Sequence, residues 1–268
     1  MRTSTTFGDI HYDISGQGPP LLLVHGTPFS SAIWEPFRPV LEQHFTVYTY
    51  DLLGYGQSAM PEGDVSLGVQ NEVLAELLDY WGLKQPMVVA HDFGGATVLR
   101  SIVINGQQYE RLLLIDVVAL SPWGSPFVQH VREHEAAFNS LPDYIHQALV
   151  ERYIQDALHG TFPAEAIAPL ASPWLSAKGK AGFYRQIAQM NTRYTDEVQG
   201  HYGQIQTPAH LLWGEEDHWV PIDKGRALKE RIPGATFQPI PDAGHLAMMD
   251  QPLQVLGAML QWLRPTLA

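Results

Sequence analysis

The chain has 268 residues, enough for one or two domains with a large buried core. Its formal net charge of −12 argues against phosphate backbones or anionic membranes as partners. It contains no cysteine, which excludes disulfides, thiolate catalysis and cysteine-bound metals. The N-terminus lacks the apolar segment of a signal peptide and no run of about 18 apolar residues occurs, so we expect a cytoplasmic protein.

The first part of the chain predicts strands and helices in alternation. Residues 5–15 have the pattern of a β-hairpin with Gly8-Asp9 as its turn. The run from Leu21 to Val24 is apolar on both faces, which is typical of a central parallel strand. It ends in the turn at 25–28, where open α/β sheets place their sites. The next expected elements are a helix from Trp34 to about His44, a buried strand from Phe45 to Tyr50, a glycine-rich turn at 51–58 and a helix at 66–81.

A strand, a sharp turn and a helix are predicted around Asp92. An apolar run from Met87 leads into the turn, two glycines follow the carboxylate, and an amphipathic run from Ala96 has the helical period. Such a unit is a nucleophile elbow, whose tip needs small residues because the backbone and the following helix approach closely. Gly94 and Gly95 supply them. The usual elbow carries a serine where this chain has Asp92.

A carboxylate at the tip of the elbow changes the expected chemistry. It is suited to displacement at a saturated carbon that carries a leaving group, because it forms an ester of the aspartate itself. Water activated by a histidine then attacks the carbonyl of that ester. The helix N-terminus should keep Asp92 ionised. A purely structural role as an N-cap is the alternative.

The second part of the chain contains a long helical stretch between sheet units. A buried strand from Arg111 to Ile115 closes with Asp116, and residues 121–205 then show no continuous apolar strand. The helices expected within this stretch are 128–138, 142–158, 164–171 and 178–190. The elements expected after it are a strand at 210–213, a helix near 223–231, a strand at 236–240 and a last helix at 252–264.

This order of elements predicts the class of the fold. We expect an α/β protein with a doubly wound, mostly parallel sheet and helices on both faces. Its core would comprise residues 1–120 and 206–268. Residues 121–205 would form a helical cap, or lid, over the site at the ends of the strands.

Two further residues complete a candidate triad. Asp217 follows the strand at 210–213, and His245 follows the strand at 236–240, in the order nucleophile, acid, histidine that this architecture uses. His245 would be the base, and Asp217 would hold its tautomer and stabilise the imidazolium. The chain has twelve histidines, and His245 is preferred for this order and for its place after a glycine on a strand-to-helix loop.

At these motifs the chain resembles the α/β-hydrolase fold superfamily over roughly its whole length. It looks most like the Asp-nucleophile branch of epoxide hydrolases, haloalkane dehalogenases and fluoroacetate dehalogenases. Residues 25–28 match the family's HGxP turn, 54–58 its GYGxS turn and 91–95 its nucleophile motif. The resemblance implies an oxyanion hole made by the N–H groups of Thr27 and Phe93. It also implies a cis Pro28.

The resemblance leaves the acid open and outlines a substrate pocket. Some members of this branch take the acid from the end of the strand that follows the elbow helix, which makes Asp116 the alternative to Asp217. The residues expected at the pocket are His25, Pro28, His91, Trp123 and Trp219.

The identity of the leaving group is the main open question. Haloalkane dehalogenases usually carry tryptophan after the nucleophile and fluoroacetate dehalogenases carry arginine, whereas this chain has Phe93, which offers no donor. Epoxide opening instead needs a proton donor, and Tyr184 resembles the cap tyrosine that supplies one in epoxide hydrolases. A second tyrosine is not assigned; the available ones are Tyr144, Tyr153 and Tyr194.

We therefore expect an epoxide hydrolase first and a haloalkane or haloacid dehalogenase second, with Trp123 as the halide donor in the latter. A hydrolase of other C–O or C–C bonds, in which Asp92 acts as a base, and a catalytically silent ligand-binding protein are the remaining alternatives. Any of these would act on a small molecule, without nucleic acid or membrane, as a monomer or homodimer.

No metal or cofactor is expected. The stretch from His130 to His134 fits the helical zinc motif H-x-x-E-H. Two histidines four residues apart on a helix still need a third ligand and a substrate pocket. A solvated helix face is the better interpretation of this charged segment.

Overall fold

The computed structural model describes residues 1–263 and forms one sheet within that range. Its eight strands there follow the order β1-β2-β4-β3-β5-β6-β7-β8. β2 pairs antiparallel with β1 and with β4, and all neighbours from β4 to β8 along the sheet run parallel. The strands are β1 (Arg2–Thr5), β2 (Gly8–Gly16), β3 (Pro20–Val24), β4 (Thr46–Tyr50), β5 (Met87–His91), β6 (Leu112–Ile115), β7 (Ala209–Gly214) and β8 (Thr236–Ile240). The predicted α/β class with a mostly parallel sheet is confirmed.

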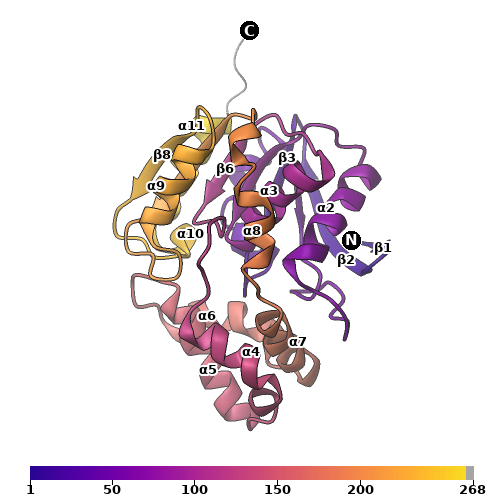
Figure 1. Cartoon of the computed structure of the whole chain (residues 1–268), viewed down its shortest axis with the longest axis vertical. Coiled ribbons are helices and arrows are strands. Elements are labelled where there is room, and N and C mark those ends of the chain that lie inside the picture. Colours follow the sequence, from indigo (N-terminus) through magenta and orange to yellow (C-terminus); the bar gives the residue numbers. More distant parts are fainter. Residues whose placement is uncertain (264–268) are drawn as a thin grey trace.

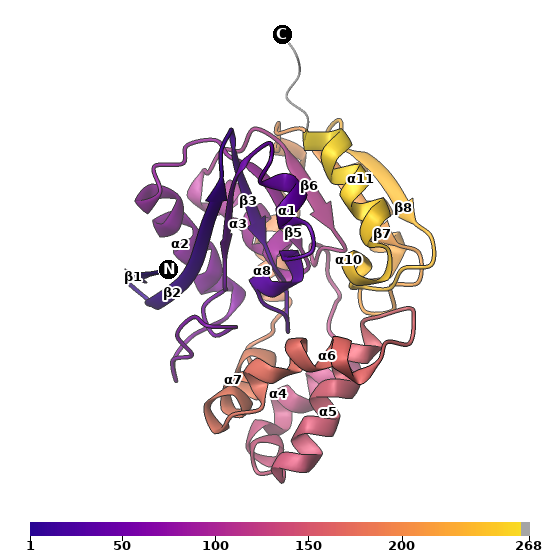
Figure 2. The same ribbon diagram turned by 180° about the vertical axis from the view of Figure 1, so that it is seen from behind.

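Helices cover both faces of this sheet (Figures 1 and 2). One face carries α2 (Leu67–Tyr80), α3 (Phe93–Asn105) and α9 (Ile222–Arg231). The other carries α1 (Arg38–Leu41) and α11 (Pro252–Leu263), with the short α10 (Ala247–Asp250) before it. The central strands β3, β5 and β6 are apolar and buried along nearly their whole length, because neither face of the sheet meets water there.

Between β6 and β7 the chain leaves the sheet for a group of helices. α4 (Pro126–Asn139), α5 (Asp143–Asp156), α6 (Ala164–Ala171) and α7 (Ala177–Ala188) gather at one end of the core, at the bottom of Figure 1. Trp174 Nε1 donates to the carbonyl of Pro28 at 2.8 Å, and Thr27 Oγ1 donates to Gln186 Oε1 at 2.9 Å. These bonds fasten the group to the turn that follows β3. The helices therefore lie over the carboxyl ends of the central strands.

Two predictions in the N-terminal part were wrong in detail. The hairpin turn is at Thr6-Phe7 and not at Gly8-Asp9, since Thr5 pairs with Gly8 across the two strands. The side chain of Thr5 accepts a hydrogen bond from the N–H of Phe7 and donates one to the carbonyl of Gly8, which closes the loop at this point. The helix expected from residue 34 to 44 is broken into a 3₁₀ turn (Ser31–Trp34) and the short α1, because prolines interrupt it.

The remaining expected elements agree with their predicted ranges within a few residues, and the four-residue α10 is one addition to them. α8 (Arg193–Gln199) was not expected, and it lies beside α3 on the core and not with the other helices of the insertion. Short 3₁₀ helices occur at Ser172–Trp174 and Tyr202–Gln204. The last helix ends at Leu263, and position 264 of the predicted range lies outside the described residues.

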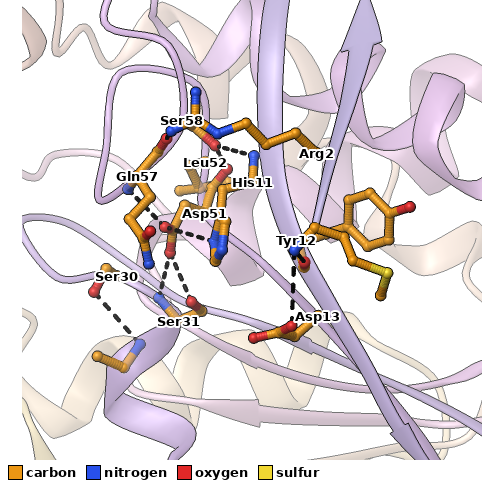
Figure 3. A network of polar contacts seen from close by, with 12 residues as sticks. Arg2, His11, Tyr12, Asp13, Ser30, Ser31, Asp51, Leu52, Gln57 and Ser58 are labelled. Carbon is orange, nitrogen blue, oxygen red and sulfur yellow. Dashed lines mark hydrogen bonds and ion pairs between the residues drawn. The ribbon is translucent and has the colours of Figure 1, made fainter.

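A buried carboxylate organises the turns that follow β4 (Figure 3). Asp51 accepts hydrogen bonds from the N–H and hydroxyl of Ser31 at 2.8 and 2.7 Å, and from the N–H of Gln57 at 2.8 Å. His11 Nδ1 lies 3.4 Å from the same carboxylate. Burial alone would raise the pKa of Asp51, but the contact with His11 and these backbone donors hold the pKa at about 2. The ionised side chain of Asp51 therefore connects β2 to the loops that contain Ser31 and Gln57.

Within residues 1–263 no helix combines the length and the apolar composition that a membrane span requires.

Candidate active site

Asp92 stands at the tip of a sharp turn between β5 and α3. Its backbone has φ +49° and ψ −117°, a strained conformation for a residue with a side chain. A Cβ atom on Gly94 would lie 2.4 Å from the carbonyl of Val24, and one on Gly95 would lie 2.1 Å from the side chain of Val117. Only glycine fits at these two positions, because α3 crosses the neighbouring strands so closely. The turn thus presents the carboxylate of Asp92 beyond the end of the sheet.

Three side chains from separate loops meet at this tip. Nε2 of His245 lies 3.3 Å from Oδ2 of Asp92, and Nδ1 of His245 lies 2.8 Å from Oδ2 of Asp217. The other oxygen of Asp217 accepts hydrogen bonds from the N–H groups of Trp219 and Val220, each at 2.8 Å. All three side chains of the candidate triad are buried. Two backbone N–H groups therefore hold Oδ1 of Asp217, while Oδ2 faces His245.

The two candidate acids occupy different places. Asp116 follows β6 and is also completely buried, with φ +48°. Its Oδ1 accepts a hydrogen bond from the N–H of Gly214 at 2.8 Å. Asp217, and not Asp116, makes the hydrogen bond to His245.

The turn after β3 approaches the other side of Asp92. The N–H of Thr27 donates to Oδ1 of Asp92 at 2.7 Å, and the peptide between Thr27 and Pro28 is cis. The hydroxyls of Thr27 and Tyr55 both donate to Oε1 of Gln186, at 2.9 and 2.8 Å. A residue of α7 therefore helps to hold the donor that contacts Asp92.

A small cavity opens above the carboxylate of Asp92. Its walls come from the core and from the helical insertion, and most of its side chains are apolar. The lining residues are Thr27, Asp92, Phe93, Val118, Trp123, Gly124, Ser125, Val128, Tyr153, Met190, Trp219 and Val220. Trp123, Gly124, Val128 and Met190 also line an outer hollow whose remaining residues include Gln129, Arg132 and Glu133. These four shared residues lie between the cavity above Asp92 and this neighbouring hollow.

Comparison with known proteins assigns the family. Residues 21–258 match the alpha/beta hydrolase family. The chain belongs to this family. A crystal structure of an alpha/beta hydrolase fold protein from Burkholderia ambifaria is 46% identical, covers 97% of each chain and superposes with a TM-score of 0.95.

Two named relatives are more distant. A putative carbamate hydrolase from Stutzerimonas stutzeri is 26% identical over 88% of this chain and 89% of its own length. A soluble epoxide hydrolase from Corynebacterium sp. is 33% identical, but over 41% of this chain and 38% of its own length. These relatives support the hydrolase family, and their names give different reactions.

The charges around His245 set its protonation in this hydrolase. Burial alone would lower the pKa of His245, but the carboxylates of Asp217 and Asp92 raise the pKa well above its usual value. These two charges favour an imidazolium in the resting site. The ring of His91 lies 4.9 Å from that of His245, and burial together with this neighbouring charge lowers the pKa of His91 to about 3.

Three residues expected at the substrate pocket do not line the cavity. Pro28 is tied by its carbonyl to Trp174, and His91 is wholly buried with Nε2 bonded to the carbonyl of His245. His25 is likewise wholly buried: Nδ1 donates to the carbonyl of Gly26, and Nε2 accepts from a backbone N–H. Their polar atoms support the surrounding turns. The two expected tryptophans, and Thr27 and Phe93, do line the cavity.

The expected position of Tyr184 over the cavity was wrong. Tyr184 is completely buried between helices of the insertion and is not among the lining residues. His146 Nε2 donates to the carbonyl of Trp174, so its Nδ1 accepts the hydroxyl of Tyr184 at 2.9 Å. The hydroxyl of Tyr184, which was expected above Asp92, therefore forms a buried hydrogen bond inside the insertion.

Tyr153 on α5 lines the cavity instead. Within residues 1–263 its hydroxyl has no hydrogen-bond partner. Burial and then the nearby charge of Asp92 raise the pKa of Tyr153. The sequence identified Tyr153 as one of several available tyrosines, but no local signal separated it from the others.

The indole N–H groups of the cavity are already engaged. Trp123 Nε1 donates to Thr195 Oγ1 at 2.8 Å, and Trp219 Nε1 lies 3.3 Å from a carboxylate oxygen of Asp156. The ring of Trp219 stacks on that of Tyr153 with centroids 4.5 Å apart. The tryptophans therefore contribute apolar walls to the cavity.

In the described part of the chain no three side chains of the metal-binding types gather as a possible metal site. The rings of His130 and His134 lie 4.7 Å apart on α4, which departs from helical geometry at His134.

Proposed function

We propose that this hydrolase opens small apolar epoxides through a covalent ester of Asp92. The observation that carries the proposal is that Asp92 and Tyr153 line one mostly apolar cavity, and that the hydroxyl of Tyr153 has no hydrogen-bond partner in the described part of the chain. A carboxylate nucleophile and a proton donor are the two groups that epoxide opening requires. Val128 and Tyr153 come from α4 and α5, so the helical insertion serves as the cap of the site.

In the first step Oδ2 of Asp92 attacks a ring carbon, and the bond between that carbon and the epoxide oxygen breaks. The electron pair goes to the oxygen, which takes the proton of Tyr153. An alkoxide is more basic than a phenolate, so this transfer is favourable even though burial raises the pKa of Tyr153. The result is a hydroxyalkyl ester of Asp92. The His245 imidazolium then restores the proton of Tyr153 and becomes neutral.

In the second step neutral His245 takes a proton from water while the water oxygen attacks Cγ of Asp92. The negative charge develops on Oδ1, which already accepts the N–H of Thr27. The bond between Cγ and the alcohol oxygen breaks, and that oxygen takes the proton from His245. The new carboxylic acid returns its proton to His245, which regenerates the resting ion triad and releases a diol.

Loss of the charge on Asp92 links the two steps. The carboxylate of Asp92 is one of the groups that raise the pKa of both His245 and Tyr153. Once the ester has formed, both pKa values fall. Tyr153 becomes a better donor as the alkoxide appears, and His245 becomes a neutral base when water must be activated.

The supporting observations favour an epoxide over an organohalide. A departing halide needs N–H donors, and the indole groups of Trp123 and Trp219 are directed to other partners. Phe93, next to the nucleophile, has no donor in its side chain. The similarity to a soluble epoxide hydrolase over part of the chain agrees with this choice.

The decisive experiment is a single turnover in H₂¹⁸O with enzyme in excess over 1,2-epoxyhexane. With a covalent ester the label enters Asp92, because water attacks Cγ, and the diol carries none. If Asp92 instead acts as a base for direct attack by water, the diol is labelled at once. Peptide mass spectrometry of the region around Asp92 and mass spectrometry of the diol measure both products.

A matched assay with 1-bromohexane tests the leaving group. Hydrolysis of the bromide without turnover of the epoxide would identify a dehalogenase and overturn the proposal. Saturable binding of both compounds without turnover would contradict a catalytic role on these substrates.

A further inference from the structure

We propose that Asp116 is a neutral carboxylic acid that positions the triad by donating its proton to Asp217. The proposal rests on the assigned role of Asp217 as the partner of His245. It does not depend on whether the substrate is an epoxide.

The first observation is the environment of Asp116. Its side chain is completely buried, and Oδ1 accepts the N–H of Gly214 at 2.8 Å. Oδ2 is buried without any hydrogen-bond donor within residues 1–263. An ionised carboxylate with one oxygen unsolvated in this way is costly, whereas a protonated Oδ2 is itself a donor. A protonated Oδ2 of Asp116 needs a hydrogen-bond acceptor close by.

The second observation is the hydrogen-bond count at Asp217. Oδ1 of Asp217 accepts two backbone N–H groups, and Oδ2 accepts Nδ1 of His245. A carboxylate offers about four acceptor sites, so one remains. Gly214 joins the two residues, because its N–H donates to Oδ1 of Asp116 and its carbonyl accepts the N–H of Asp217. A proton on Oδ2 of Asp116 fills the remaining acceptor site of Asp217 and removes the repulsion between two neighbouring carboxylates.

The surroundings decide which of the two carries it. Asp217 is stabilised as an anion by two N–H groups and by the His245 imidazolium, while Asp116 has the single N–H of Gly214. Burial and then the charge of Asp217 raise the pKa of Asp116 well above its usual value, and the charge of His245 opposes this only in part. The proton therefore resides on Asp116, directed at Asp217.

The donated hydrogen bond has a consequence for catalysis. It spreads the negative charge of Asp217 and fixes the plane of its carboxylate toward His245. Without the donor, Asp217 attracts the imidazolium proton more strongly. The pKa of His245 then rises, and the neutral base that attacks the ester intermediate requires a higher pH.

Infrared spectroscopy tests the protonation state without any substrate. In wild-type protein at neutral pH we expect the C=O stretch of a protonated carboxylic acid, shifted in D₂O and in protein labelled with ¹³C-aspartate. The band should disappear in Asp116→Asn. Absence of the band from the wild-type protein would overturn the proposal even if neither variant folds.

Titration of the His245 imidazole by NMR in labelled protein tests the positioning role. Asp116→Asn keeps an uncharged donor toward Asp217, so the pKa of His245 should stay within about half a unit of wild type. Asp116→Ala removes the donor, and the pKa should rise by about one unit, as expected for loss of a hydrogen bond to a charged group. A fall of one unit or more in Asp116→Asn would show that Asp116 is an anion. The infrared band of Asp116 and the pKa of His245 can both be measured without substrate. A negative epoxide assay would therefore contradict the proposed reaction and leave the test of Asp116 intact.

Discussion

The N–H of Thr27 donates a 2.7 Å hydrogen bond to Oδ1 of Asp92, joining two turns that are 65 residues apart in the chain. This bond gives the two oxygens of Asp92 different surroundings. Oδ1 is held where negative charge would develop during hydrolysis of an ester, and Oδ2 lies 3.3 Å from Nε2 of His245. Oδ2 is thus the oxygen assigned to the attack.

The variant His245→Gln should trap the ester of Asp92. The first step needs only the carboxylate and the Tyr153 donor, whereas the second needs a base. Incubation with 1,2-epoxyhexane should add the mass of one epoxide to the intact protein, and peptide mapping should place it on Asp92. The double variant with Asp92→Asn serves as the control and should gain no mass. An adduct at another residue would contradict the assignment.

Replacement of Asp217 by Asn should lower kcat by about ten-thousandfold, by comparison with the loss of the correct tautomer in serine triads. Asp217 is the acceptor for Nδ1 of His245, and an amide at this position can turn its N–H toward the ring. Asp223→Asn, which changes an exposed carboxylate on α9, is the matched control and should leave kcat unaltered. An effect of less than tenfold in Asp217→Asn would argue against Asp217 as the acid.

Tyr153→Phe and Tyr184→Phe should have opposite consequences. Loss of the Tyr153 hydroxyl should slow alkylation of Asp92 by an epoxide about a hundredfold or more, the cost of removing a donor to a developing oxyanion. Tyr184→Phe removes a buried hydrogen bond to His146 and should lower the free energy of unfolding by about 1 kcal/mol, with little change in alkylation. Single-turnover kinetics and urea unfolding measure the two effects. If Tyr184→Phe were the slow variant, the donor would be Tyr184.

Asp51 should make the stability of the fold depend on pH in the acid range. Its folded-state pKa of about 2 lies below the ordinary value of 3.8, so the ionised side chain stabilises the fold above about pH 4. This contribution is lost as the pH falls from about 4 toward about 2. At about 1.4 kcal/mol per unit of pKa, it amounts to about 2 kcal/mol.

Urea unfolding of wild type and Asp51→Asn at several values between about pH 7 and about pH 2 measures this contribution. The variant should be less stable at neutral pH and should lose about 2 kcal/mol less than wild type on acidification. Parallel curves for the two proteins would show that Asp51 is not the group responsible.

Met190 should influence which substrates reach Asp92, because it lines both the inner cavity and the outer hollow. Met190→Ala should enlarge the space between the two hollows and raise kcat/KM for a bulky aromatic epoxide relative to a small aliphatic one by about tenfold, the usual scale of apolar pocket effects. Met249→Ala, at a separate hollow near α10, is the control. An unchanged ratio in Met190→Ala would mean that substrates take another route.

The sequence by itself determined the features that depend on local pattern. A buried apolar run, a carboxylate and two glycines predict the elbow at Asp92, since the strand, the turn and the crossing helix are neighbours in the chain. The order of strands likewise places Asp217 and His245 on adjacent loops at one end of a parallel sheet. Periodicity was also sufficient to locate α4 to α7, although not α8, which is only seven residues long.

Only the tertiary structure decided between residues of the same type. Tyr153 and Tyr184 both lie on helices of the insertion, and the packing of those helices places Tyr153 in the lining of the cavity and directs the hydroxyl of Tyr184 toward His146. Asp116 and Asp217 both follow buried strands, and the loop after β7 turns back far enough to hold Asp217 against His245. Such choices depend on the direction of side chains between elements distant in the chain, and local periodicity carries no information about that direction.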